Sequence, residues 1–507
     1  MATPSISDPF PTVQTIDDCD STPGNWTGDT FVGETGIKKQ GTQSLTCQMT
    51  TNGANTVTNT PAAALNLTGQ HIRCWYQSGL AAYIDTVAAD GIEFWISDGT
   101  YTHRWTLGGS DDFPDGWQNM VIYAESTPTN GYSASFDFTA VTTLGFTFNT
   151  STKPRGVDNF WVDYLRYGDG LTATGGTSGD EITLDTIAAV DLANGYGIVE
   201  KSEINGVITL FGEVYIGNGA TTTWYKEDKT TAVFADTNVE ATLYKFIAQG
   251  SGCRVDLQGF NLKAYNQTYT LDMSDSGLLA LTIAGCAIST ADAVTFKAGQ
   301  SITNTVFDSC GQIIPSTATF TTNTISNYVG TDGAVLWPTD STNIHTLTFA
   351  ICDNDIEYDA ASDATPLFHN IVHDDNSGDY DVNNTSGATV TIPLTGISNG
   401  NSYNPGGDTV TFSASVTLTF TVTDEVSGSP IQYARINIVN ATTKTELYQI
   451  ETNVSGIATQ SHTYGGEVPI GGWCRQFDIS GEDYASKDFA GTIKSTGFDI
   501  AIVLSRI

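Results

Sequence analysis

The sequence lacks basic side chains over a long internal stretch. No Lys or Arg occurs between Lys297 and Arg435, although residues 298–434 contain fifteen Asp or Glu and three His. A site that binds phosphate or polyuronate, or that stabilises an oxyanion, usually recruits Lys or Arg. This absence argues against catalysis in the stretch and favours a structural or adhesive protein.

The whole chain is also poor in charge. Its 507 residues carry a formal net charge of −36, yet Asp, Glu, Lys and Arg make up only 15% of them, against roughly a quarter in an average soluble protein. Without a basic footprint, neither nucleic acid nor an anionic membrane surface is an expected partner. No apolar run reaches membrane-spanning length, so no membrane insertion is expected, and residues 1–5 do not resemble a secretory signal.

The eight cysteines are too dispersed to indicate a zinc site or a disulfide framework. No C-x-x-C pair occurs, whereas zinc ligands usually come closely spaced. Disulfide-stapled proteins are smaller and denser in cysteine. Several of the eight stand in apolar, strand-like segments, so buried free thiols are expected. They are Cys19, Cys47, Cys74, Cys253, Cys286, Cys310, Cys352 and Cys474.

The residues that are abundant favour an all-β fold. Gly occurs 51 times among short β-branched runs, and no long segment shows a 3.6-residue apolar period. Residues 1–170 alternate apolar and polar side chains, as in 91–97 and 100–107, between turn-forming clusters. We therefore expect a β-sandwich, a jelly roll, for this part. Its runs 116–119 and 157–163 resemble concanavalin-type and carbohydrate-module sandwiches.

Residues 171–411 are expected to form the second domain. It follows a Gly-rich linker at 168–180 and contains a loose repeat from about residue 181 to 410. Six apolar residues follow similar polar lead-ins at intervals of 19 to 27 residues, namely Phe260, Cys286, Val306, Ile325, Cys352 and Val372. One turn of a parallel β-helix takes about this many residues. A parallel β-helix-like domain is therefore expected, and an irregular β-sandwich stays open as the alternative.

Residues 412–507 begin with a clean alternating strand, Val416–Asp424. Four short motifs follow in order: Gly-x-Pro-Ile at 428–431, Ala-x-Ile at 434–436, Thr-x-x-x-Gly at 452–456 and Gly-x-x-Tyr at 481–484. This order resembles the carboxypeptidase-regulatory, or transthyretin-like, immunoglobulin-type sandwich. The resemblance implies an Ig-like spacer or adhesive module that carries no catalytic residues.

Aromatic side chains are the candidates for glycan binding, because the faces of pyranose rings are apolar enough to stack on Trp. The candidates are Trp75, Trp105, Trp117 and Trp337. Most aromatic residues of a sandwich fill its core, so a structural role is the alternative for each of them. Trp337 precedes a proline in a turn-like context and is expected to be the better exposed.

An Asp-rich segment is the candidate for binding Ca²⁺, because hard oxygen ligands around a Gly turn suit this ion. The ligands would be Asp374, Asn376, Asp379 and Asp381, although the match to a calcium loop is broken by the position of the Gly. A plain Asp/Asn turn is the alternative. His369 and His373 would stand roughly 13 Å apart on one strand, too far to chelate one ion. No other cofactor is expected.

Carboxylates in the same region leave open a polysaccharide depolymerase. Four acidic residues occupy alternate positions after Cys352, namely Asp353, Asp355, Glu357 and Asp359. Alternation would put them on one face of a strand, and a glycoside hydrolase holds two carboxylates beside its sugar. His373 and Asp374–Asp375 lie close in sequence. Enzymes of this kind usually add a basic residue that grips the sugar, and none is near.

The order of sandwich, β-helix-like shaft and Ig-type module resembles the appendage and decoration proteins of tailed-phage virions. This resemblance implies a non-enzymatic fibre, spike or capsid-bound fibre, commonly a homotrimer. Its partners would be other proteins of the capsid or tail and a host-surface or environmental glycan. The protein would reside in the virion, which is extracellular after host lysis. A virion-borne glycan depolymerase and a secreted bacterial adhesin are the alternatives.

Overall fold

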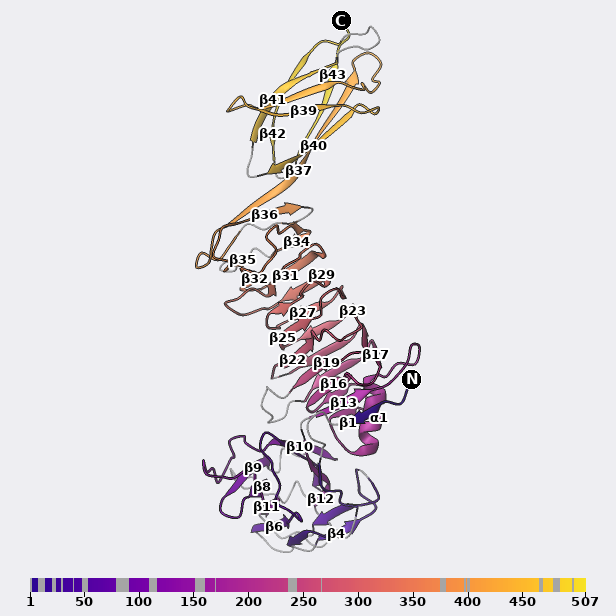
Figure 1. Cartoon of the computed structure of the whole chain (residues 1–507), viewed down its shortest axis with the longest axis vertical. Coiled ribbons are helices and arrows are strands. Elements are labelled where there is room, and N and C mark those ends of the chain that lie inside the picture. The colour runs from indigo at the N-terminus through magenta and orange to yellow at the C-terminus, as the bar shows by residue number, and fades with distance from the viewer. Residues whose placement is uncertain are drawn as a thin grey trace. The chain divides into compact units, whose positions relative to one another are not determined.

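The computed structural model consists of two compact units, Met1–Ile313 and Ile314–Ile507, which are described separately. Strands dominate both units, so the expected all-β fold is confirmed (Figure 1). The structure describes residues 2–507 except 8–13, 21–23, 29–30, 40, 48–52, 79–90, 109–115, 151–159, 169, 236–243, 266, 374–379, 396–397, 399–401, 465–467, 477–483 and 495–496.

The first unit begins with an antiparallel β-sandwich. One sheet has the order β10-β7-β12-β5-β4, with β2 also paired to β12, and the other has the order β3-β6-β11-β8-β9. The strands are β2 (Gln14–Asp17), β3 (Trp26–Gly28), β4 (Phe31–Glu34), β5 (Ser44–Cys47), β6 (Gly53–Asn59), β7 (His71–Ser78), β8 (Ile92–Ser97), β9 (Thr102–Gly108), β10 (Gln118–Tyr123), β11 (Thr143–Thr150) and β12 (Phe160–Tyr167).

Aromatic side chains fill the space between these two sheets. The ring of Phe146 on β11 lies 5.2 Å from that of Phe94 on β8 and 5.5 Å from that of Phe160 on β12. All three rings are fully buried. The period-2 alternation of these strands therefore directs one face inward, as the sequence predicts.

A parallel β-helix follows within the same unit, with three short strands in each full coil (Figure 1). The strands are β13 (Gly170–Thr174), β14 (Val199–Lys201), β15 (Ile208–Leu210), β16 (Glu213–Ile216), β17 (Thr223–Asp228), β18 (Thr231–Phe234), β19 (Lys245–Ala248), β20 (Cys253–Gln258), β21 (Asn261–Ala264), β22 (Tyr269–Met273), β23 (Ala280–Ala284), β24 (Ala287–Ser289), β25 (Ala291–Phe296), β26 (Ser301–Thr303) and β27 (Val306–Asp308).

The core of this β-helix is a set of stacked apolar ladders. In the parallel register, Val214 pairs with Phe246, Phe246 with Leu271, and Leu271 with Val294. All four side chains are fully buried. Each coil buries little apolar area alone, so stacking of neighbouring coils supplies the core. The alternative of an irregular sandwich is therefore wrong for this segment.

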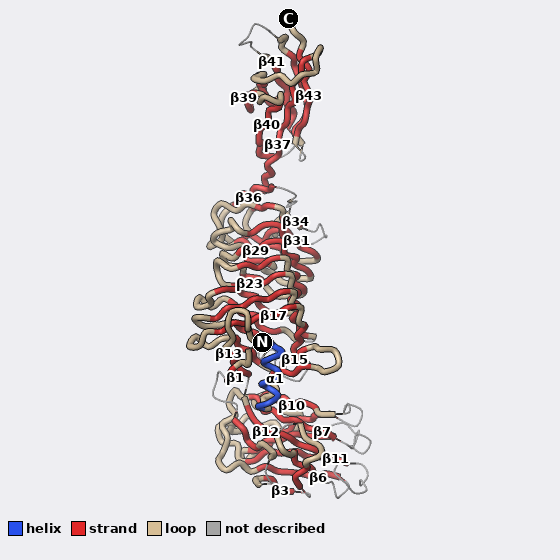
Figure 2. The backbone as a smooth tube through the Cα atoms, turned by 90° about the vertical axis from the view of Figure 1, so that its right-hand side faces the viewer, coloured by secondary structure: helices blue, strands red, loops and turns tan. Residues whose placement is uncertain are grey.

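Two elements cover the first coil of the β-helix. Strand β1 (Ser5–Ser7) pairs antiparallel with β13, and helix α1 (Leu184–Asn194) packs against β14 and β15 (Figure 2). Thr183 caps the helix by accepting the Thr186 N–H and Gly195 ends it in the left-handed conformation, with φ of 73°. Such covers protect the open edge of a parallel sheet from other chains.

The second unit contains further parallel coils. Strand β29 pairs with β31 and β31 with β34; separately, β30 pairs with β32 and β32 with β35. The strands are β29 (Thr319–Ser326), β30 (Val335–Leu336), β31 (Ile344–Ala350), β32 (Asn354–Tyr358), β33 (Phe368–His369), β34 (Ile371–Val372) and β35 (Tyr380–Asn384); β28 (Ile313–Ile314) spans the junction of the units.

One long strand links these coils to a second β-sandwich. The first part of β37 pairs in parallel with β36, and its later part pairs with β40 and β43. The opposite sheet has the order β39-β38-β41-β42. The strands are β36 (Val390–Thr395), β37 (Val410–Asp424), β38 (Arg435–Asn440), β39 (Glu446–Glu451), β40 (Ile457–Tyr464), β41 (Val468–Arg475), β42 (Lys487–Ile493) and β43 (Phe498–Leu504).

All eight cysteines are buried free thiols, as expected. Burial raises the pKa of Cys253 and Cys310 to about 12, which keeps both protonated and unreactive at neutral pH. Within the described residues, no helix has the length and apolarity needed to cross a membrane.

Asp424 should make the C-terminal sandwich sensitive to acid. Its carboxylate accepts hydrogen bonds from the Ser427 N–H (2.7 Å), the Arg506 guanidinium (2.7 Å) and the Tyr484 hydroxyl (2.8 Å). These contacts hold the pKa of Asp424 well below its usual value of 3.8. The stabilisation is therefore complete above pH 3.8 and is lost as the pH falls toward the folded-state pKa.

The measurement is calorimetric unfolding of the wild type and Asp424→Asn across acidic pH. We expect the wild-type transition of this sandwich to move to lower temperature below pH 4. The variant should unfold earlier at neutral pH and show a flatter pH dependence. An unchanged dependence in the variant would contradict this role of Asp424.

Candidate functional site

A cleft of about 900 Å³ lies in the first unit, where the β10-β7-β12 sheet meets α1 and the segment that follows it. The sandwich contributes Lys39, Trp75 and Trp117 to its lining, and the helix and its following segment contribute Asp191, Glu200, Lys201 and Ile204. Its walls therefore combine two indole rings with charged groups of both signs.

Buried arginines hold the two sides of the cleft together. Arg73 on β7 donates to the carbonyls of Gly168 (2.9 Å) and Phe211 (2.5 Å). Arg166 on β12 donates to the Tyr196 carbonyl at 2.6 Å. Burial lowers the pKa of Arg166 to about 10, which leaves it charged at neutral pH. Because these bonds join the sandwich to the first coil, the cleft has a fixed geometry.

Asp191 shapes the wall that faces Trp75. Its carboxylate accepts the N–H groups of Gly197 (2.6 Å), Ile198 (2.8 Å) and Val199 (2.7 Å). Burial raises the pKa of Asp191 to about 6, against the lowering effect of these hydrogen bonds. Gly197 has φ of 63°, and a Cβ there would stand 2.4 Å from Arg166 Nη2. The close approach of this turn to the sandwich therefore requires glycine.

Removing Asp191 should loosen this wall. Asp191→Ala removes the acceptor of three backbone N–H groups. Water from the cleft would replace only some of these hydrogen bonds. We expect a loss of about 1 kcal/mol in the free energy of unfolding and weaker ligand binding in the cleft. Urea denaturation measures the first effect. Asp185→Ala, at the exposed end of the helix, is the matched control and should cost less.

Lys39 lies over the floor of the cleft. Its Nζ is 4.0 Å from the centroid of the Trp75 ring and 2.8 Å from Glu200 Oε1. Lys201 pairs with Asp185 at 2.6 Å on the helix side. Each lysine is therefore balanced by a carboxylate, and the lining offers apolar rings beside paired charges.

Two of the four predicted Trp residues meet in this cleft. Trp75 lies on β7, and Trp117 immediately precedes β10, which pairs with β7 in the register Asn119 to Trp75. Trp75 is 4% exposed and Trp117 is half-buried. The residues that orient the site, Arg73, Arg166 and Asp191, were not anticipated from the sequence.

The other two Trp residues are buried and do not line the cleft, and the expectation that Trp337 is the better exposed is wrong. Trp105 is 8% exposed in the sandwich core, and its Nε1 donates to Ser126 Oγ at 2.9 Å. Trp337 is 1% exposed, and its ring lies 4.9 Å from that of Phe368 in the second unit. The proline that follows Trp337 marks a turn, but the indole points inward.

The predicted calcium ligands are described only in part. Asp374, Asn376 and Asp379 lie outside the described residues. Asp381 is described and buried, and its Oδ2 accepts the Ser402 N–H at 2.9 Å.

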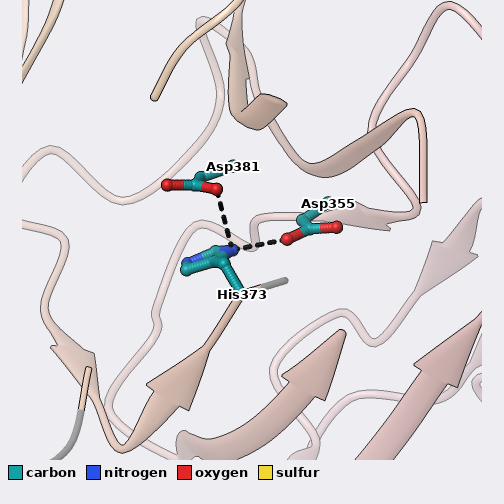
Figure 3. A group of neighbouring side chains, drawn as sticks. All are labelled: Asp355, His373 and Asp381. Carbon is teal, nitrogen blue, oxygen red and sulfur yellow. Dashed lines mark hydrogen bonds and ion pairs between the residues drawn. The ribbon is translucent and has the colours of Figure 1, made fainter. Parts of the chain in front are cut away.

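Asp381 belongs to a buried group with Asp355 and His373 in the second unit (Figure 3). His373 Nδ1 lies 2.6 Å from Asp355 Oδ2 and 3.9 Å from Asp381 Oδ1. The three side chains are no more than 4% exposed. The pairing of Asp355 with His373 across adjacent coils was not foreseen.

The acidic residues that alternate after Cys352 do not form an open catalytic pair. Asp353 is exposed, whereas Asp355 and Glu357 are buried. Glu357 accepts hydrogen bonds from Asn383 Nδ2 (2.7 Å) and from the Gly333 N–H (3.0 Å). These carboxylates therefore bond to the scaffold, whereas a hydrolase needs them beside its sugar.

Comparisons with known proteins give no family for this chain. No family model matches the sequence, and no curated protein matches it. Among solved structures, a family 11 carbohydrate-binding module from Clostridium thermocellum, in complex with a β-1,3-1,4-mixed-linked tetrasaccharide, is 14% identical with a TM-score of 0.20. The match covers 30% of this chain and 94% of that one.

An exo-β-agarase is a second similar structure, 11% identical with a TM-score of 0.21. The match covers 31% of this chain and 24% of the agarase. With TM-scores this low, neither similarity bears on function. The carbohydrate-binding module and the agarase are therefore only weakly similar in structure to this all-β chain.

Proposed function

We propose that this protein is a non-enzymatic β scaffold that binds a saccharide in the cleft between its first sandwich and α1. The observation that carries the proposal is one cavity that the half-buried Trp117 lines together with Lys39 and Glu200, beside the buried Trp75. The indole ring of Trp117 would bury the apolar face of a sugar, and the charged groups of the rim would hydrogen-bond its hydroxyls.

The charges favour a neutral saccharide. Lys39 pairs with Glu200 and Lys201 with Asp185, so both lysines among the described lining residues are already paired with a carboxylate. The net charge of −36 also repels polyanions at long range. Affinity electrophoresis against a panel of neutral, anionic and amino-sugar polysaccharides tests this. Retardation by a neutral polysaccharide supports the proposal, and retardation by none of the panel overturns it.

We further propose that the scaffold belongs to a tailed-phage virion, as a trimeric fibre, spike or capsid-bound fibre. Support comes from its module order and from its low content of charged residues; fold-level analogy alone does not determine function. Quantitative mass spectrometry of purified particles tests this. Three copies per fibre, or hundreds of copies per capsid shell, would each support the proposal. Absence of the protein from purified particles would contradict it and favour the alternative of a secreted bacterial adhesin.

A glycan depolymerase is the second candidate, and the buried Asp355–His373–Asp381 group is the observation behind it. A hydrolase would release reducing ends from host capsule or lipopolysaccharide. The burial of both carboxylates argues against access of a sugar. Sustained release that disappears in Asp355→Ala or Asp374→Ala would establish catalysis and overturn the non-enzymatic proposal.

A further inference from the structure

The group of Asp355, His373 and Asp381 has the donor set and the compactness of a metal site. The residues come from three separate segments: Asp355 from β32, His373 from the position directly after β34, and Asp381 from β35. One ligand atom from each lies within 4.8 Å of the other two. Figure 3 shows both carboxylates directed at the same ring nitrogen of His373.

Both carboxylates of this group are buried. Asp355 is 2% and Asp381 3% exposed, and buried carboxylates are commonly paired with other groups or coordinate metal ions. These strands come from the stretch 298–434, whose only basic side chains are histidines. A divalent cation bound beside these two carboxylates would offset both of their negative charges.

The imidazole ring is held in place for ligation. It stacks on Phe349 with centroids 5.4 Å apart and an interplanar angle of 4°, and it also contacts Phe368 at 5.8 Å. Its position in the apolar interior of the coils fixes the ring and directs Nδ1 toward the carboxylates. In this structure His373 Nδ1 and Asp355 Oδ2 are hydrogen-bonded to each other, so a bound metal ion would take the place of that hydrogen bond.

We propose that Asp355, His373 and Asp381 bind a divalent transition-metal ion of the Zn²⁺ type, which stabilises the coils of the second unit. Zn²⁺ accepts imidazole nitrogen and carboxylate oxygen together, whereas Ca²⁺ prefers six to eight oxygen ligands. The burial of the group suits a structural ion. This inference is independent of the saccharide proposal and concerns a different unit.

The test uses the tag-free full chain, stripped with a chelator and titrated with Zn²⁺, Co²⁺ or Ca²⁺. We expect about one tightly bound Zn²⁺ per chain by elemental analysis, and a higher Tm with Zn²⁺ than with Ca²⁺. Co²⁺ should give the visible absorption bands of a nitrogen- and oxygen-ligated site. Saccharide binding should be the same in the stripped and the loaded protein.

His373→Ala should weaken Zn²⁺ binding at least about 100-fold. The matched control is His369→Ala, which removes an exposed histidine that hydrogen-bonds Thr395 Oγ1, and it should bind as the wild type does. If His373→Ala does not fold, the stoichiometry and Co²⁺ spectrum of the wild type decide. No bound Zn²⁺ in the wild type, stabilisation by Ca²⁺ alone, or unchanged affinity in a folded His373→Ala would each overturn the proposal.

Discussion

Replacing Trp117 with Ala should weaken saccharide binding about 30-fold, which corresponds to about 2 kcal/mol. Trp117 is the more accessible of the two indoles in the cleft, and its removal deletes the apolar surface on which a sugar ring would stack. It precedes β10 and lies outside the fully buried core, so the sandwich should still fold. Isothermal titration calorimetry with the polysaccharide that retards the wild type measures the change.

Trp224→Ala is the matched control for this experiment. Trp224 is also half-buried, lies in the same unit with Arg254 over its ring at 4.6 Å, and does not line the cleft. The control should bind as the wild type does. Equal loss of affinity in both variants would show that the effect is not local to the cleft.

Replacing Trp337 with Ala should destabilise the second unit by about 3–5 kcal/mol, the usual cost of removing a fully buried indole. The side chain is 1% exposed and packs against Phe368, so the cavity left behind cannot be filled by solvent without cost. Denaturant unfolding of the full chain, followed by far-ultraviolet circular dichroism, measures the loss.

Trp473→Ala provides the comparison within the same unit. Trp473 is only half-buried on β41, so its removal should cost clearly less than that of Trp337. Equal costs for the two variants would contradict the assignment of Trp337 to the core. A loss of saccharide binding in folded Trp337→Ala would restore its predicted role as a glycan platform.

The strands were predictable because their signal is local. The alternation of apolar and polar residues, the turn-forming residues and the cysteines in apolar segments can each be recognised within a few neighbouring positions. The sequence did not predict which residue of each short β-helix strand points into the core. Val306 and Val372 were expected inside, but their neighbours Phe307 and Ile371 are buried instead. In a strand of two or three residues, an error of one position reverses inside and outside.

The single helix of the described residues was missed, although its ends carry signals. Thr183 and Thr186 form a reciprocal capping box, and Gly195 ends the helix. The buried residues Leu184, Ile187 and Asp191 lie on one face of the helix, but one of them is an Asp, and the apolar Leu192 is exposed. A search for apolar periodicity therefore passes over it.

The cleft depends on contacts between residues far apart in the sequence, which local patterns do not contain. Trp75 was a candidate for its chemistry alone, and only the pairing of β7 with β10 brings it to Trp117. Likewise, Asp355 and His373 meet because successive coils stack. One signal in the sequence could have indicated the site, because basic residues are scarce in this acidic chain. Arg73 and Arg166 are two of these few residues, and both are buried where the sandwich joins the first coil.

The most direct test of the central claim follows a bound polysaccharide over time. The full chain is incubated with the polysaccharide that it retards, and size-exclusion chromatography with light scattering measures the molar mass of the saccharide that co-elutes. A stable complex whose saccharide keeps its initial molar mass is the predicted result. A molar mass that falls steadily during the incubation would contradict a scaffold that binds saccharide without cleaving it.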